Sequence, residues 1–172
     1  MNSAENNSLI WWAVPGVLAG MPMPYVRLDR RLAGGGKLTA FDDELPILWS
    51  AGVRAVVSLL NIPTDATVYE STGFAFLCLP VSDGGAPTFE QAGEFVRFVK
   101  FHRAAGRPVS VHCEAGLGRT GTLLTTFLIA DGESAAKAIE RIRASESSTV
   151  ESNRQIIFLE QYSKYMSDTR CH

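Results

Sequence analysis

The segment VHCEAGLGRTG, residues 111–121, constrains the fold of this chain more than any other stretch. It joins a short apolar run at 108–113 to a longer apolar run at 120–130. A buried strand or helix has little reason to contain so many glycines, because glycine loses more backbone freedom on folding than any other residue. We therefore expect a strand, a tight loop and the N-terminus of a helix in direct succession.

Apolar and amphipathic segments alternate along the rest of the chain. Besides the strand before the glycine loop, the expected extended or buried strands lie at 11–20, 54–60 and 74–81. The other expected helices lie at 39–50, 88–105, 134–144 and 152–166. Pro46 is compatible with the first of these helices only near its start. This alternation predicts an α/β fold with a central, mainly parallel sheet of about four to five strands flanked by helices.

Length and composition are those of a globular protein. With 172 residues we predict a single domain over 1–172, with a core at about 9–166 and flexible ends at 1–8 and 167–172. The hydrophobic share of 46% is sufficient for a packed core, unlike that of a disordered chain. The formal net charge of −2 disfavours broad binding to nucleic acid. The oligomeric state is left open, with a monomer as the expected form.

Neither a membrane span nor an export signal is expected near the start of the sequence. The uncharged stretch at 9–26 contains Pro15, Pro22 and Pro24, which would break a helix there. The residues before it include no Lys or Arg, so the basic start of a signal peptide is missing. The chain has 3 widely spaced cysteines, which do not form a disulfide framework. A reducing compartment, and hence a cytoplasmic location, is the expectation.

The glycine loop offers a nucleophile beside an anion site. The backbone N–H groups of residues 114–119 can point inward, because Ala115, Gly116 and Gly118 present little or no side chain. N–H groups at a helix N-terminus bind anions, and the helix dipole adds partial positive charge. Such a setting lowers the pKa of a cysteine thiol from about 8.5 to roughly 3.5–7.5, so Cys113 is expected as a thiolate. Since Arg119 can bind two oxygens of one phosphate, the pattern predicts attack of sulfur on phosphorus.

Four residues of this loop match a family signature. His112, Cys113, Arg119 and Thr120 fit HCxxxxxR(S/T), so the chain resembles the cysteine-dependent protein tyrosine and dual-specificity phosphatases. VHCEAGLGRTGTLL looks like the loop of the mitotic-exit phosphatases, and WAVPGVLAG and GVRAVVSLL resemble the small atypical dual-specificity enzymes. The resemblance covers roughly residues 11–162. It implies a phosphatase that needs no metal or cofactor and acts on phosphoproteins or phosphopeptides.

The resemblance also implies a general acid on a loop about thirty residues before the cysteine. Asp83 lies thirty positions before Cys113, within PVSDGGAPT. As an acid it would protonate the leaving oxygen, and as a carboxylate it would activate the hydrolytic water, assistance worth ~10²–10⁴ in rate. The neighbouring Gly84, Gly85 and Pro87 suit a mobile lid.

The other site residues follow from this chemistry together with the resemblance. Thr120 is expected to hydrogen-bond the sulfur, and His112 to brace the loop through backbone hydrogen bonds without acting as a base. Gln155 is expected either near the hydrolytic water or on a helix surface. The expected phosphate-binding residues are Glu114, Ala115, Gly116, Leu117, Gly118 and Arg119. The basic stretch at 27–37 is expected to be a solvated loop, with a grip on acidic substrates as the alternative.

Other substrates and other functions remain compatible with this sequence pattern. A phosphoinositide or another small phosphate ester would need the same chemistry, although Glu114 disfavours a highly anionic headgroup. A non-catalytic phospho-residue binding module, or an enzyme of sulfur transfer or arsenate reduction, would share the loop but would not need Asp83. The stretch RASESSTVES at 143–152 replaces the Arg-Pro-Gly of many relatives. No long segment resembles the deep phosphotyrosine pocket loop of the large enzymes, so a shallow cleft that also admits phosphoserine and phosphothreonine is favoured.

Three further expectations concern the cysteine thiols and follow from where the residues lie in the sequence. Cys78 lies in an apolar run and is expected in the core. A protective disulfide between Cys78 and oxidised Cys113 is a hypothesis. A zinc site built from His102, His112 and these two cysteines lacks chelating spacing and is not expected.

Overall fold

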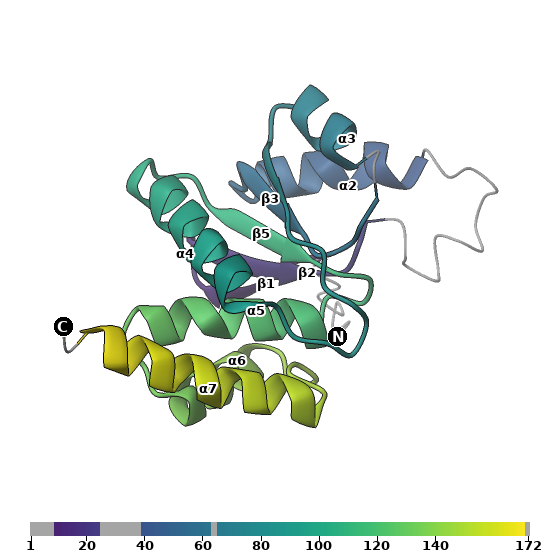
Figure 1. Ribbon diagram of the computed structural model, residues 1–172. Coiled ribbons are helices and arrows are strands. Elements are labelled where there is room, and N and C mark those ends of the chain that lie inside the picture. The colour runs from purple at the N-terminus through teal and green to yellow at the C-terminus, as the bar shows by residue number, and fades with distance from the viewer. Residues whose placement is uncertain (1–8, 25–38, 63–64, 171–172) are drawn as a thin grey trace, which may run out of the picture.

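A five-stranded sheet runs through the computed structural model, which describes residues 9–24, 39–62 and 65–170 (Figure 1). Its strand order is β1–β2–β5–β3–β4, with β1 antiparallel to its neighbour and the other pairs parallel. The strands are β1 (Trp11–Val14), β2 (Leu18–Met21), β3 (Ala55–Ser58), β4 (Ala75–Cys78) and β5 (Val109–His112). The predicted α/β fold with a mainly parallel sheet is therefore confirmed.

Helices cover both faces of this sheet. They are α2 (Thr39–Ser50), α3 (Asp65–Ser71), α4 (Phe89–Ala104), α5 (Gly118–Ala130), α6 (Ala135–Ser145) and α7 (Asn153–Arg170). In Figure 1, α4, α5, α6 and α7 gather on one side of the sheet, and α2 and α3 lie on the other. None of these helices is both long enough and apolar enough to cross a bilayer.

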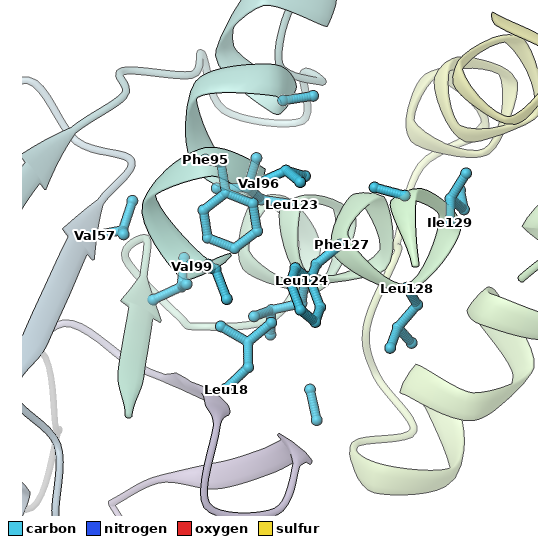
Figure 2. Close-up of a cluster of buried hydrophobic side chains, with 14 of the residues drawn as sticks. Leu18, Val57, Phe95, Val96, Val99, Leu123, Leu124, Phe127, Leu128 and Ile129 are labelled. Carbon is cyan, nitrogen blue, oxygen red and sulfur yellow. The ribbon is translucent and has the colours of Figure 1, made fainter. Parts of the chain in front are cut away.

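Alternating side chains of the strands form two cores. Leu18 and Val57 are fully buried in the cluster with α4 and α5, where Figure 2 shows them beside Phe95 and Leu124. Their strand neighbours Ala19 and Val56 belong to the second cluster, which also contains residues of α2 and α3. Successive residues of a strand point to opposite faces, so each strand contributes to both layers.

Two helix starts follow the local sequence closely. Thr88 caps α4: its side chain accepts from the Gln91 backbone N–H, and the Gln91 side chain accepts from the Thr88 N–H, as a capping box requires. Ser134 caps α6 by accepting from the Lys137 N–H. The helices predicted at 88–105 and 134–144 are thus found to within a residue.

Other elements differ from the sequence prediction. Residues 11–20 are not one extended segment but most of a hairpin, in which Gly16 turns the chain at φ 67°. The short helix α3 was not predicted. Helix α2 continues through Pro46, since burial of Leu45 and Leu48 against the sheet holds it in place. Helix α7 extends beyond position 166, where the core was predicted to end, to Arg170.

The prediction that Cys78 belongs to the core is wrong. Strand β4 lies at the edge of the sheet, where it pairs with β3 alone, and Cys78 at its end is exposed. The apolar run at 74–81 is therefore only partly buried. The basic stretch predicted at 27–37 and the end segments at 1–8 and 171–172 lie outside the described residues.

Candidate active site

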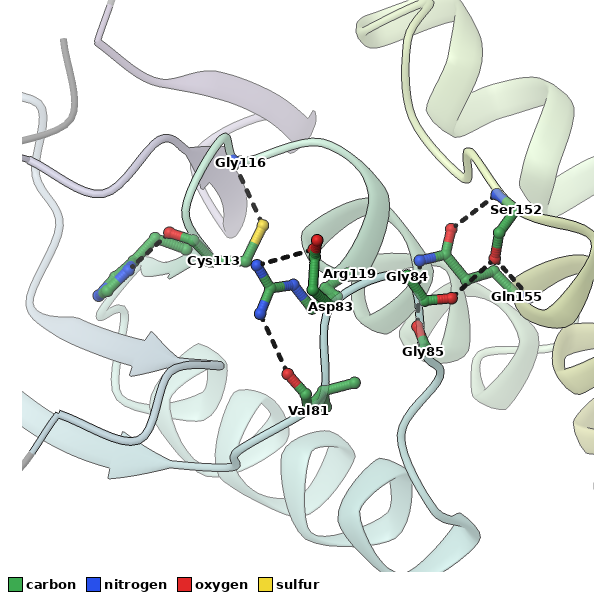
Figure 3. A network of polar contacts seen from close by, with 10 residues as sticks. Val81, Asp83, Gly84, Gly85, Cys113, Gly116, Arg119, Ser152 and Gln155 are labelled. Atoms are coloured by element: carbon green, nitrogen blue, oxygen red, sulfur yellow. Dashed lines mark hydrogen bonds and ion pairs between the residues drawn. The ribbon is translucent and has the colours of Figure 1, made fainter.

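The glycine loop leaves the sheet at its centre. Strand β5 lies between β2 and β3, ends at His112, and is followed by Cys113 and a loop that enters α5 at Gly118. The helix thus begins two residues before the predicted start at 120, and Arg119 lies in its first turn. Cys113 is buried, and its Sγ accepts a hydrogen bond from the Gly116 backbone N–H at 3.3 Å (Figure 3). The loop thus turns its Gly116 N–H toward the sulfur, and its role as an anion cradle stays a prediction.

Two glycines allow this loop to pack tightly. Gly116 has φ 77°, and a Cβ there would collide with the backbone of Met21 and Pro22. A Cβ on Gly118 would collide with the carboxylate of Glu151. The end of the first hairpin and the α6–α7 connection therefore both press on the loop.

Arg119 connects this loop with the segment that carries the predicted acid. Its guanidinium is 8% exposed, donates to the Val81 carbonyl at 3.1 Å, and forms an ion pair with the Asp83 Oδ1 at 3.2 Å. The Asp83 side chain is 93% exposed, so its carboxyl lies on the open side of the loop. Figure 3 shows both residues beside Cys113. The structure therefore brings together three residues that the sequence separates by as many as 36 positions.

His112 braces the base of the loop, as predicted, but with an additional partner. Its Nδ1 lies 3.2 Å from the Cys113 carbonyl, which can only accept, so this nitrogen carries the proton. Its Nε2 then accepts from the Tyr69 hydroxyl at 3.1 Å. Full burial lowers the pKa of His112 to about 4, although the bond to the Cys113 carbonyl raises it. The imidazole is therefore neutral near pH 7. The sequence pattern does not single out Tyr69, because it does not predict α3, the helix that carries this residue.

Thr120 lies beside the loop but does not make the predicted hydrogen bond to the Cys113 sulfur. It is fully buried, and its hydroxyl oxygen has no hydrogen-bond partner among the described residues. The predicted bond from Thr120 to the sulfur is therefore not formed. Buried hydroxyls without a partner are uncommon and require an explanation.

One of the two predicted environments of Gln155 is wrong. It is 1% exposed, so a position on the helix surface is wrong. Its Oε1 accepts from the backbone N–H groups of Glu151 and Ser152, and its Nε2 donates to the Gly85 carbonyl at 3.0 Å. Backbone groups thus engage both ends of the amide, and its predicted place near the hydrolytic water stays a prediction. Ser152, which the sequence did not single out, donates to the Gly84 carbonyl at 3.0 Å.

The loop residues predicted to bind phosphate differ in exposure. Glu114 and Ala115 are exposed, Leu117 is half-buried, and Gly116, Gly118 and Arg119 are buried. The Glu114 carbonyl accepts from the Met23 N–H at 3.0 Å, which fixes the outer part of the loop to the segment after β2. What the loop offers an anion is therefore its backbone together with Arg119.

The strand register and the contacts of His112 bear on the two alternative roles of the thiols. Ser58 pairs with His112 on one side and with Cys78 on the other, which places the two flanking residues roughly 9–10 Å apart across the strands. A disulfide needs Cα atoms within about 7 Å. The separation above is that of His112, the residue before Cys113, so the hypothesis of a Cys78–Cys113 bond stays a prediction. Both ring nitrogens of His112 are engaged, and the described residues contain no cluster of three metal-ligating side chains.

Comparisons with known proteins agree on one class. A family model described as "Polymorphic toxin system, DSP-PTPase phosphatase" matches residues 33–133. Protein tyrosine phosphatase type IVA 3 from Homo sapiens is 34% identical over 113 residues, which are 64% of this chain and 65% of that protein. The type IVA 2 enzyme from Mus musculus is 31% identical over 127 residues, 73% of this chain and 74% of that protein. This chain thus spans just under two thirds of the human relative.

Solved structures share the fold over a larger part of the chain. Tk-PTP in its active form has a TM-score of 0.74 at 26% identity, covering 91% of this chain and 97% of that one. PTPMT1 has a TM-score of 0.73 at 22% identity, covering 94% and 98%. The arrangement of strand, loop and helix described above is therefore shared by solved phosphatases.

Proposed function

The chain belongs to the DSP-PTPase phosphatase family, and from this we propose that it is a protein phosphatase that hydrolyses phosphotyrosine, and also phosphoserine and phosphothreonine, without a metal ion. One observation carries the proposal. The Cys113 sulfur lies in a backbone loop, with Arg119 at its side and Asp83 reaching Arg119 from a segment 30 positions before the cysteine. A nucleophile, a phosphate-binding group and an acid therefore meet at the carboxyl edge of the sheet.

In the first step the Cys113 thiolate attacks phosphorus and the bond to the leaving oxygen breaks. Arg119 and the backbone N–H groups of residues 114–119 stabilise the three equatorial oxygens. Asp83 gives its proton to the departing alkoxide or phenoxide. Its present ion pair places the carboxyl beside the guanidinium that would hold the phosphate.

In the second step water replaces sulfur on phosphorus. Asp83, now a carboxylate, accepts a proton from the attacking water, and inorganic phosphate leaves. The Thr120 hydroxyl makes no hydrogen bond to the sulfur among the described residues, so it would have to turn toward the departing Cys113 thiolate to donate to it. His112 stays neutral and takes no proton, since its burial disfavours the charged form.

The proposed substrates are phosphoproteins or phosphopeptides, and the proposed compartment is the reducing cytoplasm, where the thiol stays reactive. PTPMT1 has been solved in complex with PI(5)P, and that structure has a TM-score of 0.71 at 22% identity. A phosphoinositide is therefore the second candidate. The exposed side chain of Glu114 disfavours a polyanionic headgroup, because like charges near a site select against it.

The test is the kcat/KM on matched phosphotyrosine and phosphothreonine peptides and on PI(5)P, all in EDTA, with Cys113→Ser as control. Turnover of both peptides that Cys113→Ser abolishes is the expected result. A strong preference for phosphotyrosine would instead require a deep pocket. Turnover of PI(5)P alone would replace the protein substrate by the lipid, and turnover by Cys113→Ser would remove the proposed nucleophile.

A further inference from the structure

The segment that carries Asp83 is fixed along its length. We define residues 80–85 as the acid loop. Side chains from three different helices donate to its carbonyls: Gln91 of α4 to Pro80 at 2.9 Å, Arg119 of α5 to Val81 at 3.1 Å, and Gln155 of α7 to Gly85 at 3.0 Å. Residues 80–85 are thus hydrogen-bonded to α4, α5 and α7, and their movement as a lid stays a prediction.

Ser152 makes a fourth connection to the acid loop. It immediately precedes α7 and its Oγ accepts from the Gln155 N–H at 3.2 Å, as an N-cap does. The same hydroxyl donates its proton to the Gly84 carbonyl at 3.0 Å. One side chain therefore starts the helix and holds the acid loop (Figure 3).

The position of Ser152 is fixed relative to the phosphate loop by the packing around it. Helix α7 packs against α5, which carries Arg119. Just before Ser152, Val150 adopts φ 55°, an uncommon conformation for a β-branched residue, and the Arg143 side chain donates to the carbonyls of Thr149 and Val150. Strained backbone of this kind persists only where its surroundings impose it. The direction of Ser152 is therefore set by the α6–α7 connection.

We propose that Ser152 and Gln155 are positioning residues that hold Asp83 over the phosphate loop for proton transfer. The two carbonyls they bind belong to Gly84 and Gly85, directly after Asp83, where glycine would otherwise permit a wide range of backbone angles. Loss of the hydrogen bonds lets the acid leave its position without changing Cys113 or Arg119. This inference rests on the proposed phosphatase function.

The test compares leaving groups. Phenyl phosphate has a poor leaving group that needs the acid, and p-nitrophenyl phosphate a good one that needs it less. For Ser152→Ala we expect kcat/KM on phenyl phosphate to fall roughly 10–100-fold, the scale of a misplaced catalytic group, with a clearly smaller loss on p-nitrophenyl phosphate. Ser152→Thr keeps the hydroxyl and should restore the ratio. Gln155→Glu keeps the accepting oxygens but loses the donor to Gly85, and should act like Ser152→Ala.

Two controls separate positioning from folding. Ser134→Ala removes the cap of α6, away from the acid loop, and must leave the leaving-group ratio unchanged. In an Asp83→Asn background Ser152→Ala should have no further effect, because a residue that acts through Asp83 has nothing left to position. An unchanged ratio in Ser152→Ala, or an undiminished effect in the Asp83→Asn background, would overturn the inference. If the wild-type protein hydrolyses neither ester, the proposed function itself falls, a result distinct from either of these.

Discussion

The buried imidazole of His112 connects the phosphate loop to α3 through Tyr69, and its charge state depends on folding. In an unfolded chain its pKa is about 6.5. In the folded protein burial lowers the pKa to about 4. Between these values the unfolded chain binds a proton that the folded one does not. The stabilisation is therefore complete above pH 6.5 and is lost as the pH falls to about 4.

We therefore predict that the free energy of unfolding decreases between pH 6.5 and 4, with His112 contributing up to about 3 kcal/mol of the loss. His112→Asn should flatten this part of the curve, as measured by urea unfolding at several pH values. His102, whose pKa burial and Arg107 also lower, provides the matched control. His102→Gln must leave the contribution of His112 in place. An equal slope in wild type and His112→Asn would contradict the assignment.

At the scale of elements, neighbouring residues determine where a helix begins. They do not determine which place a strand takes in the sheet. The capping box at Thr88 was visible in the sequence because both partners lie within four residues of each other. The edge position of β4 was not visible, since it depends on the order of strands that are distant in the chain. Cys78 was misplaced for this reason, although its neighbours are apolar.

The cap of α4 gives a prediction at this scale. Thr88→Ala should reduce the free energy of unfolding by about 1 kcal/mol, the usual cost of a lost N-cap. The kcat/KM should stay near the wild-type value, since Gln91 still donates to Pro80. Thr88→Ser keeps the accepting oxygen and should recover most of the stability in the same denaturation experiment. If Thr88→Ser is as unstable as Thr88→Ala, packing of the methyl group and not the cap explains the loss.

At the scale of the whole molecule, the site is assembled by four parts of the chain. β5 delivers Cys113, the acid loop delivers Asp83, the α6–α7 connection delivers Ser152, and the first hairpin supports Gly116. The placement of Asp83 beside Arg119 and of Cys113 before α5 could be predicted, because a family pattern fixes their spacing. The placement of Tyr69 and Ser152 could not, because the hydrogen bonds that matter go to distant groups, the His112 ring and the Gly84 carbonyl, and such contacts leave no periodic trace in the sequence.

An oxyanion that occupies this assembly should stabilise the whole fold. Tungstate at 100 times its Kd would add about 2.7 kcal/mol to the free energy of unfolding, and Cys113→Ser should retain this effect. Arg119→Lys keeps the charge but loses the planar fork, so its stabilisation by tungstate should be much smaller. Thermal unfolding with and without tungstate, at matched ionic strength, measures both. Equal stabilisation of wild type and Arg119→Lys would place the anion elsewhere.

The contact between Gly116 and the backbone of Met21 and Pro22 has a consequence for divergence. A side chain at position 116 has no room unless the end of the first hairpin moves, and that hairpin pairs with β5 through β2. A descendant of this chain could therefore not alter position 116 by a single tolerated step. The first hairpin, residues 11–21, and the loop around the sulfur would have to change together during evolution.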